Sequence, residues 1–68
     1  MRVVLNGEER DLGDGACVRD AVLATGAPGE GRGVAVALDG EVVPRGRWDD
    51  QVLADGQRVE VVRAVQGG

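Results

Sequence analysis

The chain has 68 residues, of which 12 are acidic and 8 are basic, so its net charge is −4 at neutral pH. A chain of this length can bury one hydrophobic core and therefore forms a single domain near the lower size limit for independent folding. The negative charge argues against non-specific binding to nucleic acid or to an anionic membrane surface.

The residue types present exclude several kinds of catalytic and metal site. The chain has no His, Lys or Tyr, and Cys17 is its single thiol. An internal disulfide needs a second Cys, a zinc site needs several Cys or His ligands, and an activated nucleophile needs a general base such as His. We therefore expect no bound cofactor, no metal and no enzymatic activity of the chain's own. It also lacks an apolar signal core and the roughly 20 apolar residues that span a bilayer, which predicts a soluble, cytoplasmic protein.

The first predicted element is a β-hairpin. Residues 2–5 and 8–12 flank Asn6-Gly7, the dipeptide best suited to positive φ at both positions of a two-residue type I′ turn. Thirteen valines along the chain further favour strands over helices.

One short helix follows. Apolar residues recur at helical spacing over residues 18–24, and Gly26 supplies a stop. The start of the helix is weak, because Cys17 occupies the cap position and a thiol is a poor acceptor. Asp14 or Asp20 is expected to assist the exposed amides.

A glycine-rich surface loop over residues 26–33 precedes a second hairpin. Residues 34–38 and 41–43 bracket Asp39-Gly40, another tight-turn dipeptide. Pro44 ends the pairing, since it lacks a backbone donor.

The rest of the chain is predicted to be a crossover and a last strand. The crossover, residues 44–56, is expected to be anchored by Trp48, Val52 and Leu53, with Trp48 at the edge of the core. Residues 57–64 form the last strand. The element order predicts an α+β fold in which a mixed sheet of about five strands packs on one helix.

The strands also predict an apolar patch on the outer face of the sheet. Strand side chains alternate between faces, so one valine of each of the pairs 3–4 and 61–62 points away from the core. We expect Val4 and Val62 to face outward, joined by Val42 or Val43, as a candidate partner-docking patch. The alternative explanation is the β-propensity of valine on a solvated face.

The sequence ends in Gly67-Gly68, which suits processing by another protein. Glycines carry no side chain beside the carbonyl and extend freely, so residues 65–68 are expected to be a flexible tail that can enter a narrow active site. The Gly68 carboxylate is the candidate reactive group. Gln66 and Gly67 are the candidate recognition residues.

A family resemblance agrees with this pattern. Residues 36–48, residues 53–59 and Gly67-Gly68 together resemble the ThiS-type sulfur carriers, which are ubiquitin-like β-grasp proteins. The segment Val-Pro-Arg-x-x-Trp, ending at Trp48, is the most distinctive part. Cys17 departs from the hydroxyl residue that these carriers commonly place at the helix cap.

The resemblance implies a β-grasp domain over residues 1–64 and a specific chemistry at Gly68. An adenylating, E1-like enzyme uses ATP to activate the carboxylate, and a sulfur donor such as a cysteine desulfurase converts it to a thiocarboxylate. Thiazole synthase then takes the sulfur for thiamine biosynthesis. The resemblance implies a protein co-substrate that is a monomer when free.

Three alternatives remain open from the sequence. The chain is a carrier for molybdopterin or a sulfur-containing secondary metabolite, or a ubiquitin-like protein modifier, or an interaction domain in which the glycines are incidental.

Overall fold

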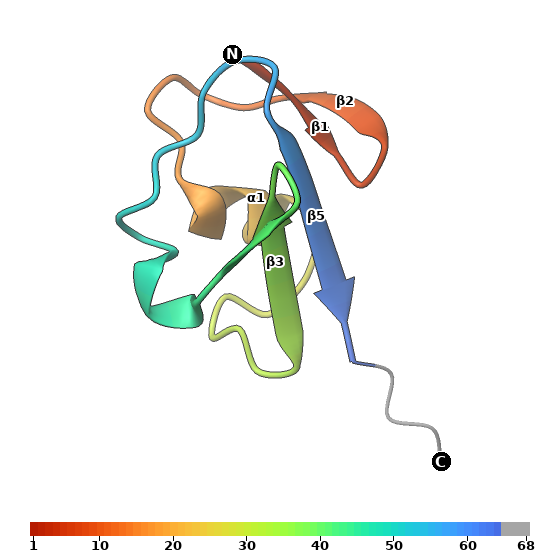
Figure 1. The fold of residues 1–68 in the computed structure, drawn as a ribbon, viewed down its shortest axis with the longest axis vertical. Coiled ribbons are helices and arrows are strands. Elements are labelled where there is room, and N and C mark those ends of the chain that lie inside the picture. The colour runs from red at the N-terminus through yellow and green to blue at the C-terminus, as the bar shows by residue number, and fades with distance from the viewer. Residues whose placement is uncertain (65–68) are drawn as a thin grey trace.

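The structure, a computed structural model, describes residues 1–64, and residues 65–68 lie outside the described part. Its elements are β1 (Arg2–Leu5), β2 (Glu8–Asp11), α1 (Val18–Ala24), β3 (Val34–Leu38), β4 (Glu41–Val43), the 3-10 helix η1 (Arg45–Arg47) and β5 (Arg58–Arg63). The five strands form one sheet in the order β2-β1-β5-β3-β4 (Figure 1). The β1–β5 pair is parallel and the other pairs are antiparallel. The predicted α+β β-grasp architecture, a mixed sheet with one helix, is confirmed.

Both hairpin turns have the geometry that their dipeptides predict. Asn6 and Gly7 have φ of 50° and 83°, and Asp39 and Gly40 have φ of 48° and 87°. These are the positive values that a two-residue type I′ turn requires. The turns therefore fix the register of β1 with β2 and of β3 with β4.

The side chains of the two turn residues tie both hairpins to β5. The Asn6 amide accepts from the Val61 N–H at 2.8 Å and donates to the Val61 carbonyl at 3.2 Å. The Asp39 carboxylate accepts from the Arg58 N–H at 3.0 Å and from Gln57 Nε2 at 3.1 Å. These hydrogen bonds, the first of them above all, lower the pKa of Asp39 below its ordinary value. The central strand β5 is thus hydrogen-bonded to both turns, to Asn6 on the β1 side and to Asp39 on the β3 side.

The helix has the predicted bounds, and Asp20 supports its first turn. The Cys17 N–H donates to the Asp20 carboxylate at 2.8 Å, which satisfies one of the amides left free at a helix start. Val18, Ala21 and Val22 on the opposite side of the helix are buried against the sheet. Seven residues are too few for a stable isolated helix, so this packing is what stabilises α1.

The core lies between α1 and one face of the sheet (Figure 1). The predicted alternation in β1 and β5 is confirmed, since their core-facing side chains are all buried: Val3, Leu5, Val59 and Val61. Burial of each such side chain contributes about 1.5–3 kcal/mol to folding. The core is aliphatic apart from one aromatic ring.

That ring, Trp48, is fully buried, so the prediction that it lies at the edge of the core is wrong. It is 1% exposed, its Nε1 donates to the Val43 carbonyl at 3.0 Å, and the Arg19 guanidinium lies 5.5 Å from the ring centroid. Leu53 is buried as predicted, whereas the side chain of Val52 is 57% exposed, so the prediction that it anchors the crossover in the core is wrong. Val52 forms an isolated β-bridge with Cys17, and the alternation along this extended segment turns Val52 outward while Leu53 points inward.

Gly31 approaches Trp48 closely, which leads to a stability prediction. Gly31 has φ of +77°, and a Cβ at this position would lie 2.6 Å from Cζ3 of Trp48 and 2.6 Å from Cδ of Arg45. We expect Gly31→Ala to destabilise the fold by about 2–4 kcal/mol through overpacking and backbone strain. Urea unfolding followed by circular dichroism measures this.

Gly46→Ala is the matched control, because a Cβ there meets no atom within 4 Å. It should change the free energy of unfolding by less than about 1 kcal/mol. Equal unfolding midpoints for the two variants would show that Gly31 is not a tight packing position.

Candidate functional site

The outer face of the sheet, away from α1, carries an apolar patch at the β3, β4 and β5 strands. Ala35 pairs with Val62, and Ala37 pairs with Val42, so these four side chains share a face. The exposed Glu60, which pairs with Ala37 on its other side, borders them. Val62 and Val42 are 62% and 75% exposed. We call Ala35, Ala37, Val42 and Val62 the outer patch.

The outer patch differs from the predicted set in two members. Val43 faces the core, opposite Val36, and packs against the buried cluster, so Val42 is the outward valine of β4. Val4 is on the outer face but half-buried, and it pairs with Arg58. Arg58 is four residues, or about 13 Å, from Val62 along β5. Val4 therefore lies apart from Val62, which is placed as predicted.

The predicted tail residues Gln66, Gly67 and Gly68 lie outside the described residues. The structure does define the point of the fold to which these residues are attached. β5 ends at Arg63, and the Ala64 N–H donates to the Gly33 carbonyl at 2.6 Å. The start of the tail is thus held to the glycine-rich loop by a backbone hydrogen bond.

Four residues separate Ala64 from the end of Gly68. Extended chain spans at most about 3.3–3.6 Å per residue, so the Gly68 carboxylate can reach roughly 14 Å beyond Ala64. That length suffices to enter an active site of a second protein while the folded body rests on that protein's surface.

Two grooves flank the start of the tail. One, of about 500 Å³, is lined by Ala35, Val62 and Arg45 as well as Gly33 and Ala64. The other, of about 580 Å³, also includes Gly33 and Ala64. The first groove therefore connects the outer patch to the base of the tail.

The opposite end of the molecule holds the amino terminus. The Met1 ammonium lies 3.4 Å from Asp11 and 3.5 Å from Asp14, and the hydrogen bond to Asp11 is the main cause that raises its pKa. Both carboxylates are exposed, so these ion pairs contribute little to stability.

Residues 1–64 contain no cluster of His, Cys, Asp and Glu that could hold a metal ion. Within this part of the chain no helix is long and apolar enough to cross a membrane.

The sequence analysis did not indicate Ala35 and Ala37. The signal for the two alanines was present, because Val36 and Leu38 alternate with them and face the core. Arg45 joins the groove at the tail only through the fold of the crossover.

The sequence and the fold of this chain are similar to those of known proteins. The sequence model of the ThiS family matches residues 3–68. The crystal structure of the thiamine biosynthesis protein ThiS from Geobacter metallireducens is 27% identical with a TM-score of 0.79, and the alignment covers 100% of both chains. A solution structure of a thiamine biosynthesis protein from the same organism is 28% identical with a TM-score of 0.81, covering 100% of this chain and 88% of that one.

A curated relative extends the comparison to a larger protein. A thiazole synthase of Paramagnetospirillum magneticum is 32% identical over 68 residues, which is 100% of this chain and 20% of the relative. The chain thus spans about a fifth of the length of the curated relative that it matches.

Proposed function

Because this chain belongs to the ThiS family, we propose that it is the sulfur carrier of a thiamine biosynthesis pathway and that Gly68 carries the sulfur. The observation that carries the proposal is the match over residues 3–68, which includes the diglycine, to a family whose solved members share the whole fold. The folded body then serves as a recognition element for the enzymes that process the tail.

The proposed chemistry follows from the poor reactivity of a carboxylate. An adenylating enzyme lets the Gly68 carboxylate attack the α-phosphorus of ATP, and pyrophosphate leaves. The resulting acyl adenylate has AMP as a good leaving group, which a carboxylate oxygen is not. A sulfur donor then displaces AMP at the carbonyl carbon to give a thiocarboxylate. This chain supplies the carboxylate and the docking surface, and its partners supply the ATP site and the sulfur.

The thiazole synthase relative supports the choice of acceptor. In that protein a segment like this whole chain makes up a fifth of a polypeptide named for thiazole synthesis. Sharing one polypeptide raises the effective concentration of two units that work together. We infer that a thiazole synthase takes the sulfur from Gly68, in preference to a molybdopterin-forming enzyme.

The outer patch is the proposed docking surface for these partners. Val62→Asp places a charge in its exposed part and should weaken partner binding about tenfold or more, because the charge would be desolvated at the interface. Titration of the adenylating enzyme by isothermal calorimetry measures the dissociation constant.

Val52→Asp is the matched control, since Val52 is 57% exposed, close to the 62% of Val62, and lies outside the outer patch. It should bind within about twofold of the wild type. If Val62→Asp binds as tightly as the wild type, the outer patch has no role in docking.

Reconstitution tests the function itself. After incubation with ATP, the adenylating enzyme and a sulfur source, the intact mass of the protein should rise by the difference between a sulfur and an oxygen atom. Addition of thiazole synthase and its other substrates should return the mass to its starting value. Ladders of conjugates in immunoblots of host lysate, with no such mass change, would instead indicate a protein modifier.

A further inference from the structure

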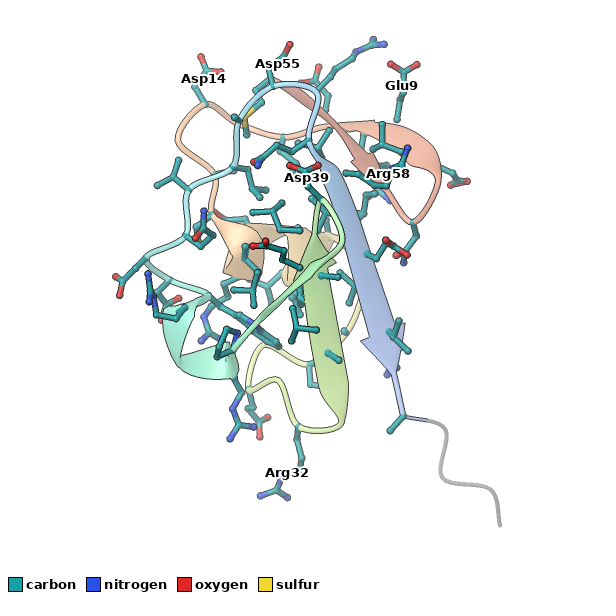
Figure 2. All side chains as sticks on the ribbon, in the orientation of Figure 1. Glu9, Asp14, Arg32, Asp39, Asp55 and Arg58 are labelled. Carbon is teal, nitrogen blue, oxygen red and sulfur yellow. The ribbon has the colours of Figure 1, made fainter. Side chains whose placement is uncertain are left out.

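Charge is unevenly distributed between the two ends of the molecule. Glu9, Asp14 and Asp55 lie at the end that holds the amino terminus, whereas Arg32 lies at the end where β5 finishes (Figure 2). The acidic end is partly neutralised, because Met1 pairs with Asp14 and Arg2 pairs with Glu9.

The end from which the tail departs carries three arginines. Arg63 is the last residue of β5, and Arg45 and Arg32 each line one of the two grooves that meet at Ala64. We call Arg32, Arg45 and Arg63 the tail-base arginines. All three are exposed.

Their charges are largely uncompensated by the rest of the fold. Within residues 1–64 none of the three takes part in an ion pair, although Glu30 lines the same groove as Arg32. By contrast, Arg19, which supports the core, pairs with Asp49. A chain with a net charge of −4 therefore presents a local positive surface around the base of its tail.

Resting on the proposed function, we infer that the tail-base arginines dock on an acidic rim around the entrance to the tail-binding channel of the adenylating enzyme. The arrangement combines the exposed apolar side chain of Val62 with Arg45 in one groove, as in an interface with an apolar centre and a charged border. Complementary charge at such a border sets the orientation and the rate of association. Here it would orient the tail toward the channel.

The length of the tail decides which anions the tail-base arginines can contact: carboxylates of the adenylating enzyme or phosphates of its bound ATP. An extended tail puts the Gly68 carboxylate, and with it the α-phosphate that it attacks, roughly 14 Å beyond Ala64. Charge-assisted hydrogen bonds need contact at about 2.7–2.9 Å. Arginines at the base of an extended tail therefore meet the mouth of the channel, where Asp and Glu side chains are the available anions.

Association kinetics test this inference. The adenylating enzyme of the same organism is immobilised on a biosensor surface, and the full chain is passed over it at two ionic strengths. Arg63→Glu and Arg32→Glu should each lower the association rate constant about three- to tenfold at low salt, leave the dissociation rate constant nearly unchanged, and reduce the dependence on salt.

Arg10→Glu is the matched control, because Arg10 is an exposed strand residue with the same charge change in β2, at the far edge of the sheet. The substitution also removes the 3.1 Å hydrogen bond from Arg10 to the Ala24 carbonyl, so the fold of this variant is checked separately. Its association rate should stay within about twofold of the wild type. Circular dichroism confirms that all variants are folded.

Equal slowing by Arg63→Glu and Arg10→Glu would show that only net charge matters and would overturn the inference, as would wild-type kinetics for Arg63→Glu and Arg32→Glu. If the wild-type protein associates and gains sulfur but these arginines prove neutral, the proposed function stands without the acidic rim. If the wild type neither associates nor gains sulfur, the proposed function fails and this inference fails with it.

Discussion

Gly68→Val is expected to lower the rate of adenylation at least about a hundredfold while leaving the unfolding of the domain unchanged. Valine places a branched isopropyl group on the Cα next to the reacting carboxylate, and a displacement of about 1 Å at a reaction centre costs a factor of this size. Pyrophosphate release in the presence of ATP and the adenylating enzyme measures the rate. The unfolding transition should not change, because the buried core is built from residues between Val3 and Val61.

Addition of one bulky residue after Gly68 should have an equal effect, since it moves the free carboxylate away from the diglycine. Gly46→Ala is the control within the domain, at an open position where a side chain touches nothing. Adenylation of Gly68→Val at the wild-type rate would show that the diglycine is not recognised, and the chemistry proposed for it would have to be abandoned.

Trp48→Ala is expected to destabilise the fold by about 3–5 kcal/mol, the range for truncation of a large buried aromatic side chain. Domains of this size have a total stability near the lower end of about 5–15 kcal/mol, so much of the variant should be unfolded at 37 °C. The loss combines the cavity left by a 1%-exposed ring with loss of the hydrogen bond to the Val43 carbonyl. Urea unfolding followed by far-ultraviolet circular dichroism measures it.

Trp48→Phe separates the two contributions. It keeps most of the ring volume but leaves the Val43 carbonyl without its 3.0 Å donor, so about 1–3 kcal/mol should be lost. Similar stabilities of Trp48→Ala and the wild type would mean that the ring is not the centre of this core.

Much of the fold follows from local sequence signals. Asn6-Gly7 and Asp39-Gly40 each specify a turn by a conformation that few other dipeptides tolerate, and the turn sets the register of its hairpin. The same logic assigns the faces of β4. A two-residue turn puts Glu41 opposite Leu38, which faces the core, so the alternation points Val42 outward. The strand alternation alone leaves Val42 and Val43 as alternatives, and this register selects Val42.

Other features depend on contacts between distant parts of the chain. The burial of Trp48 requires Gly31 to pass beside the ring, and that approach is decided by the path of a glycine-rich loop with no periodic pattern. Val52 is turned outward by its bridge to Cys17, 35 residues earlier in the sequence. Single-sequence patterns carry no information on such pairings.

The positions of the tail-base arginines also depend on contacts between distant parts of the chain, so the sequence alone does not predict this part of the candidate site. The diglycine is visible in the sequence, and so is the apolar character of β5. Arg32, Arg45 and Arg63 are spread over 32 residues, however, and only the return of β5 beside β3 brings them to the same end of the molecule. A positive surface on an acidic chain is thus a property of the fold.

The intact mass of the protein isolated from its native host, grown without thiamine, tests the central claim most directly. The account predicts a fraction of molecules heavier by the difference between sulfur and oxygen, with the added mass located at Gly68 by fragmentation. A population in which Gly68 carries only the unmodified carboxylate, under conditions that demand thiazole synthesis, would contradict it.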